Sequence, residues 1–319
     1  GNTRSYAGDV EFGPDAAIPT FFSELHLQWF DRYLKGKNAE VNEWPPIRMF
    51  VMGTGDGHKD ENGRLYHGGY WTDKTQWPLP DAKPTRYYFH ADGTLSTSAP
   101  TESVAATTYT YDPAHPVPTI GGSFSGALKR GAYDQRERMF KSLRGGSENG
   151  FYGSRSPYLP LKSRPDVVVF QTEPLEEPVE VIGPITVTLY ASSSAPDTDF
   201  TVKLVDVYPP SEDFPSGFDM NITDGIIRAR YRNSSSRPEL MTPGEVYEFE
   251  IEPFPTGNHF KAGHRIRIDV SSSNFPRFDV NPNTGEPLGQ HRRSMSADNS
   301  IYHDATHTSH VVLPIVPVP

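Results

Sequence analysis

The stretch that decides the fold is Phe260–Glu286, FKAGHRIRIDVSSSNFPRFDVNPNTGE. Between Arg265 and Val270, charged and apolar residues alternate, and this period of two predicts a strand with its apolar side chains on one face. Further on, Pro276 and Pro282 remove backbone donors that a central strand needs. The stretch therefore predicts a buried strand that carries a long polar loop to one end of a sheet, a place where functional residues often lie.

The polar loop supplies the candidate site residues of this chain. Its turn-forming residues also fit an ordinary loop built from Asx turns, in which the side chains bond to nearby backbone. The candidate functional residues of the loop are Asn274, Phe275, Arg277, Asp279, Asn281 and Asn283.

From residue 85 onward the chain has the pattern of an all-β domain. Short strand-like runs recur between Pro, Gly, Asp and Ser, and no helical pattern separates them, which predicts an antiparallel sandwich of the jelly-roll type at 85–319. Residues 120–165 look like an irregular insertion. The predicted strands are 86–90, 107–111, 167–171, 179–182, 185–191, 200–207, 225–231, 246–251, 265–270 and 310–315.

Residues 1–84 have a different character. A helix is predicted from Thr20 to Lys35, with Gly36 as its C-cap, and a strand from Ile47 to Met52. The flanking stretches 1–17 and 53–84 are expected to be a loop and a connector. Both sides of this helix carry large apolar residues, so it needs a partner surface larger than residues 37–85 can provide.

Charge and composition exclude several classes of function. The chain has 319 residues, a formal charge of −10 and no cysteine. The negative charge argues against nucleic acid or an anionic membrane as the main partner. The lack of cysteine excludes a disulfide framework and a cysteine nucleophile, but leaves a cytoplasmic or secreted location open.

A search for a nucleophilic serine finds no G-x-S-x-G motif. The runs Gly121–Gly126 and Gly145–Asn149 come close, but neither has a glycine two residues before and two residues after a serine, and neither follows an apolar strand. These glycines are interpreted as loop residues.

Two patterns suggest metal sites, and each has a simpler explanation. His303 and His307 have the spacing of a zinc motif, but the flanking residues predict strand and turn instead of the helix that the motif requires. Asp279, Asn281 and Asn283 have the spacing of a calcium loop whose glycine and final acidic residue are misplaced, so Asx turns explain them better. No metal or cofactor is predicted.

Two aspartates and two tryptophans are further candidates for binding residues. Asp197 and Asp199 are expected to cap a turn or to pair with Arg228 or Arg230. Trp71 and Trp77 could stack on sugar rings, although packing is the more common role of Trp.

The sequence of Phe260–Glu286 also matches a known family. It resembles the C-terminal β-domain of the cocaine-esterase-like and X-Pro dipeptidyl-peptidase-like serine hydrolases, the CocE/NonD acyl hydrolases. Further segments match the same family in order over essentially the whole chain: LHLQWFDRYLKG (25–36), IRMFVMG (47–53), WPLP (77–80), GAYDQR (131–136), the block 166–209, ITDGIIRARYR (222–232), the block 243–268 and SIYHDATHTSHVVLPIVP (300–317).

The resemblance implies an α/β-hydrolase domain with a helical cap, followed by a jelly roll, and a Ser-His-Asp triad that cleaves esters or amides through an acyl-enzyme. In the family the triad histidine precedes a segment that looks like Gly1–Gly13 here. The chain is therefore expected to start just after that histidine, and no residue in it inherits a catalytic role.

The resulting hypothesis is the C-terminal accessory part of a serine hydrolase. Residues 1–84 would be the C-terminal remnant of the α/β-hydrolase domain, with one helix, one strand and a connector. The expected partner is the upstream hydrolase domain. By analogy with the family, the loop Asn274–Glu286, with its six candidate residues, would pack against that domain near the active-site entrance. A homo-oligomer formed through the apolar helix is an open alternative. The alternative is a free-standing β-sandwich module that binds carbohydrate or protein. The substrate is left open, because the cap and the pocket that select it would lie upstream.

Overall fold

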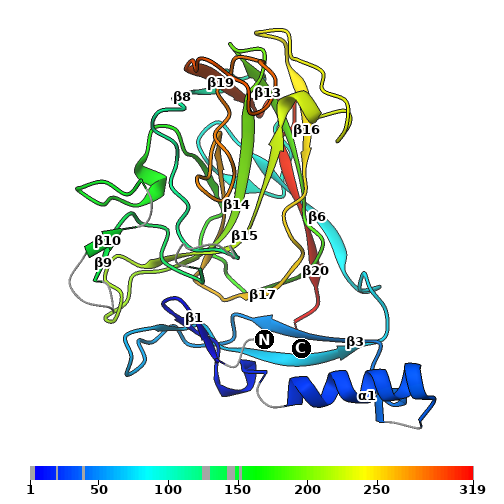
Figure 1. Ribbon diagram of the computed structural model, residues 1–319. Helices are drawn as coiled ribbons and strands as arrows, with labels where there is room; N and C mark the ends of the chain where they lie inside the picture. Colours follow the sequence, from blue (N-terminus) through cyan, green and yellow to red (C-terminus); the bar gives the residue numbers. More distant parts are fainter. Residues whose placement is uncertain are drawn as a thin grey trace.

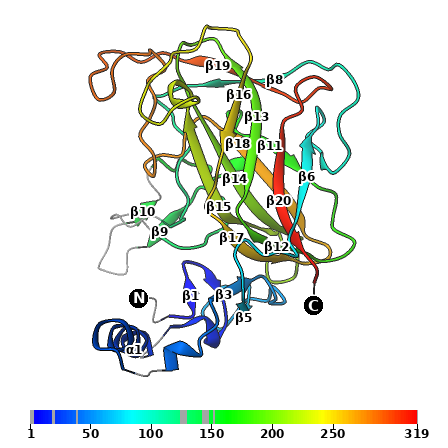
Figure 2. The same cartoon turned by 90° about the vertical axis from the view of Figure 1, so that its right-hand side faces the viewer.

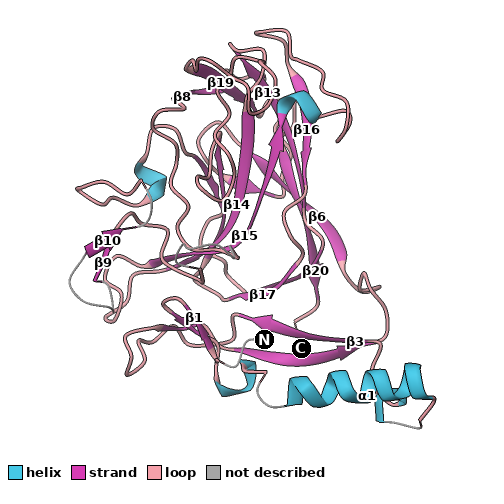
Figure 3. Ribbon diagram, viewed as in Figure 1, coloured by secondary structure: helices cyan, strands magenta, loops and turns pink. Residues whose placement is uncertain are grey.

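The computed structural model describes residues 4–18, 21–37, 40–123, 130–141, 148–150 and 153–318. Over these residues the protein is mostly β, which confirms the predicted fold class (Figure 3). Figures 1 and 2 show a two-sheet sandwich above a lower layer that contains α1, β1, β3 and β5. We define the lower layer as the described residues of 4–82.

The lower layer contains one α-helix and several short strands. Its elements are β1 (Tyr6–Ala7), β2 (Val10–Glu11), η1 (Pro14–Ala16), α1 (Phe21–Lys35), η2 (Glu40–Asn42), β3 (Ile47–Met52), β4 (Leu65–Tyr66) and β5 (Gly69–Lys74).

The described remainder of the chain contributes strands with two short 3-10 turns. Its elements are β6 (Lys83–Phe89), β7 (Leu95–Ser96), β8 (Thr107–Tyr111), β9 (Met139–Lys141), β10 (Glu148–Gly150), η3 (Leu161–Ser163), β11 (Val168–Gln171), β12 (Val179–Gly183), β13 (Thr186–Ser193), β14 (Asp199–Tyr208), β15 (Phe218–Arg228), η4 (Ala229–Tyr231), β16 (Tyr247–Ile251), β17 (Thr256–Phe260), β18 (Arg265–Ser271), β19 (Ala297–Tyr302) and β20 (His310–Val316).

Two sheets make the sandwich. The smaller has the order β11-β18-β14-β15, and all of its pairs are antiparallel. The larger follows the path β5-β3-β17-β12-β20-β13-β19-β8, with β6 beside β20 and β16 beside β13. Strands β3 and β5 of the lower layer form one end of the larger sheet. They connect to its other strands through a single parallel pair, Met52 of β3 opposite Asn258 of β17.

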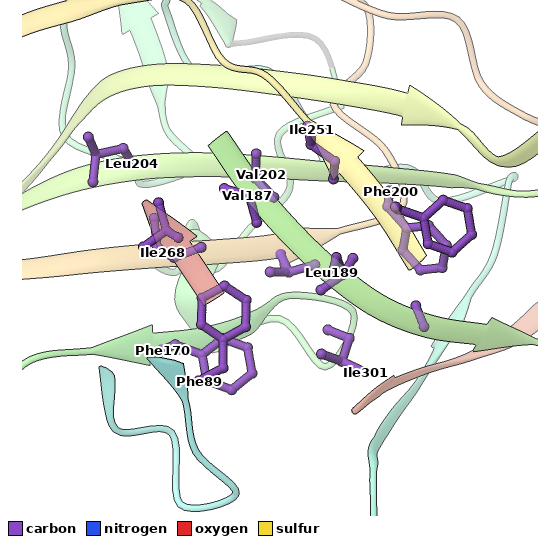
Figure 4. Close-up of a cluster of buried hydrophobic side chains, with 14 of the residues drawn as sticks. Phe89, Phe170, Val187, Leu189, Phe200, Val202, Leu204, Ile251, Ile268 and Ile301 are labelled. Atoms are coloured by element: carbon purple, nitrogen blue, oxygen red, sulfur yellow. The ribbon is translucent and has the colours of Figure 1, made fainter. Parts of the chain in front are cut away.

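The core lies between the two sheets (Figure 4). Alternation along each strand directs one set of apolar side chains inward. Phe89 of β6 stacks on Phe170 of β11 with ring centroids 4.4 Å apart. Phe200 of β14 packs on Phe249 of β16 at 4.8 Å. Each of these pairs joins one sheet to the other, so the aromatic residues hold the sandwich closed.

The outer face of the smaller sheet is also covered. Described residues of 112–167, which we call the covering segment, lie over it. Gln135 donates its backbone N–H to Asp219 O at 2.9 Å, and Lys203 Nζ donates to Gln135 Oε1 at 3.1 Å. As a result, the charged side of β18 is buried, and Arg267 is fully inaccessible to solvent.

Helix α1 ends as its sequence predicts. Gly36 has a φ of 65°, a conformation that glycine adopts without steric cost. The backbone N–H of Gly36 donates to Arg32 O at 3.2 Å, and that of Lys37 donates to Asp31 O at 3.1 Å. The predicted first residue, Thr20, lies outside the described residues.

Several predicted boundaries need correction. Residues 1–17 were expected to be loop but contain β1 and β2, and the connector 53–84 contains β4 and β5. The strand predicted at 225–231 is β15, which ends at Arg228 and gives way to η4. Strands β17 and β19 were not predicted.

Candidate functional site

The polar loop that follows β18 is tied to the covering segment by backbone pairing. The N–H of Phe275 donates to Val117 O at 2.9 Å, and the N–H of Thr119 donates to Phe275 O at 2.7 Å. Arg277 N–H donates to Thr119 Oγ1 at 3.2 Å. The loop is therefore held in place by a segment more than 150 residues away in the sequence.

The first half of the loop converges on Asp224 of β15. Asn274 Nδ2 donates to Asp224 Oδ2 at 3.0 Å, and Arg277 Nη1 lies 2.6 Å from Asp224 Oδ1. The Arg277 guanidinium carbon lies 5.9 Å from the ring centroid of Phe254, a side chain that is 65% exposed. The Arg277 side chain is only 9% exposed, so this geometry places a nearly buried cation beneath an exposed aromatic ring.

Phe254 is a residue that the sequence analysis missed. It stands between Pro253 and Pro255, and such flanks favour a loop over a strand. That signal could have indicated an exposed aromatic residue, although its proximity to Arg277 depends on the fold.

The second half of the loop closes two buried ion pairs. Arg228 Nε donates to Asp199 Oδ1 at 2.8 Å, and Arg230 Nε donates to Asp197 Oδ2 at 2.8 Å, which confirms the predicted pairing. Asn281 Nδ2 donates to both aspartates, at 2.9 Å and 2.8 Å. Burial raises the pKa of Asp199, and Arg228 opposes the rise. Asn281 thus supports an internal network.

The spacing of Asp279, Asn281 and Asn283 serves an Asx turn. Asn281 Oδ1 accepts the backbone N–H of Asn283 at 2.9 Å, and Asn283 Nδ2 donates to Met295 O at 2.8 Å. Asn283 has a φ of 64°, which asparagine tolerates better than most residues. Asp279 is exposed. Nowhere in the described part of the chain do three or more His, Cys, Asp or Glu residues form a group that could hold a metal ion.

The six candidates therefore divide into two groups. The side chains of Asn274, Asn281 and Asn283 are buried and bonded within the sandwich. Phe275 is half-buried, the Arg277 side chain is 9% exposed, and Asp279 is exposed. A role in contacting another domain stays a prediction, and Asp279 and Phe275 have the side chains that are most accessible for such a contact.

Two cavities lie on either side of this loop. One, of about 450 Å³, is lined by Arg228, Arg230, Asp279 and Glu286 among others. The other, of about 390 Å³, is lined by residues that include Phe275. Because Arg228 and Arg230 already pair with buried aspartates, the larger cavity offers no uncompensated positive charge to an anion.

The remaining sequence candidates do not come together. His303 Nε2 lies 2.9 Å from Thr107 Oγ1. His307 instead packs between Tyr190 and Tyr302, with ring centroids 5.6 and 5.4 Å away. Of the serines in the two glycine-containing runs, Ser123 is exposed, whereas Ser125 and Ser147 lie outside the described residues.

The two candidate sugar-stacking tryptophans lie in or next to the lower layer's β5. Trp71 Nε1 donates to Asp15 O at 2.7 Å, and its ring packs edge-on against Phe50 at 5.4 Å. The two indoles are only partly exposed, 37% for Trp71 and 42% for Trp77. Trp71 therefore has a packing role within the lower layer.

The largest apolar surface with no partner in the described chain is on α1. Its outward side chains are Leu27, Trp29, Phe30, Tyr33 and Leu34, which are 58%, 49%, 52%, 63% and 76% exposed. Leu25 and Gln28 are half-buried toward the rest of the lower layer. No helix in the described part of the chain has both the length and the apolarity needed to cross a membrane.

Known proteins resemble this chain over almost its whole length. The family model described as the X-Pro dipeptidyl-peptidase C-terminal non-catalytic domain matches residues 39–312. The chain is 39% identical to the cocaine esterase of Rhodococcus sp. (strain MB1 Bresler) over 328 aligned positions, which cover 99% of this chain and 50% of the esterase.

Two solved structures have a similar fold over almost the whole chain. An aminopeptidase from a marine sediment Thaumarchaeota archaeon superposes with a TM-score of 0.74 and 26% identity, covering 99% of this chain and 47% of that one. An α-amino acid ester hydrolase gives 0.74 and 28%, covering 98% and 47%. The chain spans about half the length of these relatives. It belongs to the family of X-Pro dipeptidyl-peptidase C-terminal non-catalytic domains.

Proposed function

We propose that this chain is the accessory part of a serine hydrolase that cleaves esters or amides. Relatives twice its length include a cocaine esterase, an aminopeptidase and an α-amino acid ester hydrolase. In this proposal the nucleophile, the base and the acid come from an upstream α/β-hydrolase portion. The sandwich is a jelly roll, and the lower layer is the end of the hydrolase domain.

The observation that carries the proposal is the exposed face of α1. Five large apolar side chains on one short helix face solvent, whereas soluble proteins seldom leave such a contiguous patch uncovered. An upstream hydrolase portion that packs on this face would bury it. The helix would then be shared by both parts and would fix the sandwich to the catalytic portion.

The loop after β18 provides a second contact in this proposal. Phe254 presents an exposed aromatic ring, and Arg277, whose side chain is 9% exposed, lies behind it and is fixed by the ion pair with Asp224. A rigid contact of this kind can hold one wall of a substrate entrance, because its side chains do not have to be ordered when substrate binds.

A fluorophosphonate probe, which labels activated serine nucleophiles, tests the proposal in two steps. The purified 319-residue chain is expected to stay unlabelled. Material captured from the source cells with an antibody against residues 85–319 is expected to contain a labelled serine in a peptide outside this sequence. Heat-sensitive labelling of the 319-residue chain, or a native protein that consists of this chain alone and stays unlabelled, would overturn the proposal.

A further inference from the structure

The seam between the lower layer and the sandwich is closely packed. Two glycines of the segment after β3 bring backbone against the sandwich. A Cβ on Gly53 would lie 2.2 Å from His259 O, and one on Gly57 would lie 3.0 Å from the Tyr208 ring. Lys261 Nζ also donates to Gly55 O at 2.8 Å. Because the seam is so closely packed, a polar group in it has to form its hydrogen bonds with other groups of the seam.

His67 is the central polar group of this seam. It lies between β4 and β5 and is fully buried. Its Nε2 is 2.9 Å from Asn258 Oδ1 of β17, and its Nδ1 is 2.5 Å from the hydroxyl of Tyr208 at the end of β14. One imidazole therefore bridges the lower layer to two strands that belong to different sheets.

The neighbouring bonds determine which nitrogen carries the proton. Asn258 Nδ2 faces Asp206 Oδ2 at 3.3 Å, so Asn258 Oδ1 faces His67 as an acceptor. His67 Nε2 must then be protonated and donate. Burial raises the pKa of Tyr208 well above its ordinary value, so its hydroxyl keeps a proton and can donate it to Nδ1. In this arrangement the imidazole is neutral, and every polar hydrogen in the bridge has an acceptor.

A second proton on His67 would change this arrangement. An Nδ1–H could only donate to the Tyr208 oxygen, so the hydroxyl proton of Tyr208 would lose its acceptor inside a packed site. The backbone of His67 is committed as well, because its N–H donates to Glu11 O at 2.9 Å and its carbonyl accepts from Gly55 N–H at 2.6 Å. A cation formed here has no water to solvate it.

The charged and titratable groups around His67 come from several elements. Asp206 lies behind Asn258, and His264, just before β18, has its Nδ1 2.7 Å from Asp206 Oδ1. Phe12 packs edge-on against the imidazole at 5.7 Å. Burial lowers the pKa of His67, Asp206 opposes this decrease, and His264 adds to it. Asp206 therefore faces a second imidazole and is not free to stabilise a charged His67 by itself.

A tyrosine–carboxylate contact crosses the same seam, and a histidine of the sandwich faces the same carboxylate. Tyr70 of β5 donates its hydroxyl to Glu180 of β12, at 3.1 and 3.0 Å from the two carboxylate oxygens. His259 Nδ1 of β17 lies 3.2 Å from Glu180 Oε2. Because this carboxylate can accept from both partners, the contact does not depend on a neutral His259.

We propose that His67 makes the seam an acid-sensitive joint, in which protonation of its imidazole releases the lower layer from the sandwich. The joint is independent of the substrate and of the catalytic residues. It couples the position of α1, and of anything packed on α1, to the pH around the protein.

The direction of the effect follows from linkage. The ordinary pKa of histidine is 6.5, and that of buried His67 is lower. Between the two values the unfolded seam binds more protons than the closed one, so closing becomes less favourable as the pH falls. The stability of the joint is fully present above pH 6.5 and decreases as the pH falls toward the lowered pKa.

The tryptophans allow a direct test. All four, Trp29, Trp44, Trp71 and Trp77, lie in the lower layer, so their emission reports on this part of the chain alone. Urea titrations of the 319-residue chain at about pH 7.5 and about pH 5.5 are expected to give a clearly lower midpoint of the Trp transition at the acidic pH. In His67→Gln the shift should largely disappear, because glutamine can donate to Asn258 and accept from Tyr208 without titrating.

The matched control is His58→Gln. His58 lies in the same segment but is half exposed beside Asp56, so this variant should keep the wild-type shift. Equal shifts in wild type and His67→Gln, or no shift in wild type, would overturn the proposal. If His67→Gln does not fold, hydrogen exchange at imidazole C2 in the wild type decides the matter, and a titration midpoint of His67 at or above 6.5 overturns it.

Discussion

Arg267 shows how strongly a single buried charge can depend on its partners. Its Nε donates to Asp269 Oδ1 at 2.8 Å, its Nη1 lies 2.9 Å from Asp219, and the side chain is fully buried. Burial alone would lower the pKa of Arg267, but the two carboxylates raise it above its ordinary value. The residue therefore stays charged within the layer between β18 and the covering segment.

Replacing Arg267 should be costly because it leaves buried Asp269 without its cation and leaves buried Asp219 with Lys162 alone. We expect Arg267→Gln to lower the free energy of unfolding by about 3–5 kcal/mol, measured by urea denaturation. Arg265→Gln is the control, since Arg265 lies on the same strand, is partly exposed and faces an exposed Glu173. It should cost less than about 1 kcal/mol. Equal losses in the two variants would show that the buried triad contributes nothing of its own.

The cost of replacing a glycine also depends on the atoms that surround it. Gly53 has a φ of 101° and a Cβ there would lie 2.2 Å from His259 O, whereas Gly63 has a φ of 79° and nothing within 4 Å. We expect Gly53→Ala to destabilise the chain by about 3 kcal/mol or more, because strain and a backbone clash add. Gly63→Ala should cost about 1–2 kcal/mol from backbone strain alone. Thermal unfolding of both variants measures the difference, and similar losses would contradict close packing at the seam.

At the scale of elements, the pattern of residues predicted a strand best where apolar residues alternate. Strands β8, β14 and β18 were found within a residue or two of their ends. Strand β17, TGNHF, was missed because Gly257 and Asn258 have low β-propensity. Its place between β3 and β12 is set by pairing with residues about 75 to 205 positions away, which no local window contains.

Helix α1 gives a prediction about association. In the 319-residue chain, sedimentation velocity should show self-association that Leu34→Lys reduces, since Leu34 is 76% exposed on the apolar face. The same change should alter the free energy of unfolding by less than about 0.5 kcal/mol. Leu240→Lys, at a 46% exposed position in the sandwich, is the control and should leave association unchanged. A monomeric wild type would contradict this prediction.

At the scale of the whole molecule, the predicted boundary near residue 84 can be tested by dissection. The lower layer pairs with the larger sheet only at Met52 and Asn258. A fragment that begins at Lys83 should therefore unfold in one cooperative transition in urea, followed by circular dichroism. Its midpoint should be lower than that of the whole chain, because Val51 and Leu79 no longer cover Ile182 and Val316. A fragment without a cooperative transition would show that the lower layer belongs to the folding unit.

The candidate site was less predictable than the sandwich, for a physical reason. The turn residues of the loop after β18 indicated Asx turns correctly, and the pairing of Asp197 and Asp199 with Arg228 and Arg230 was expected. That Asn281 joins both aspartates depends on contacts across more than 80 residues. Likewise, the charged face of β18 has the pattern of a solvent-facing surface, and only the covering segment makes it a buried one.

The position of β20 has a consequence for how the protein is made. It is the last strand of its sheet in chain order, yet it lies in the interior of that sheet, with β6, β12 and β13 as neighbours. During translation these three strands leave the ribosome with unpaired backbone groups beside the site that β20 will occupy. The larger sheet can close only after His310–Val316 has been synthesised, so a nascent chain should depend on chaperones until then, and a premature stop codon just before His310 should yield aggregate instead of a shortened fold.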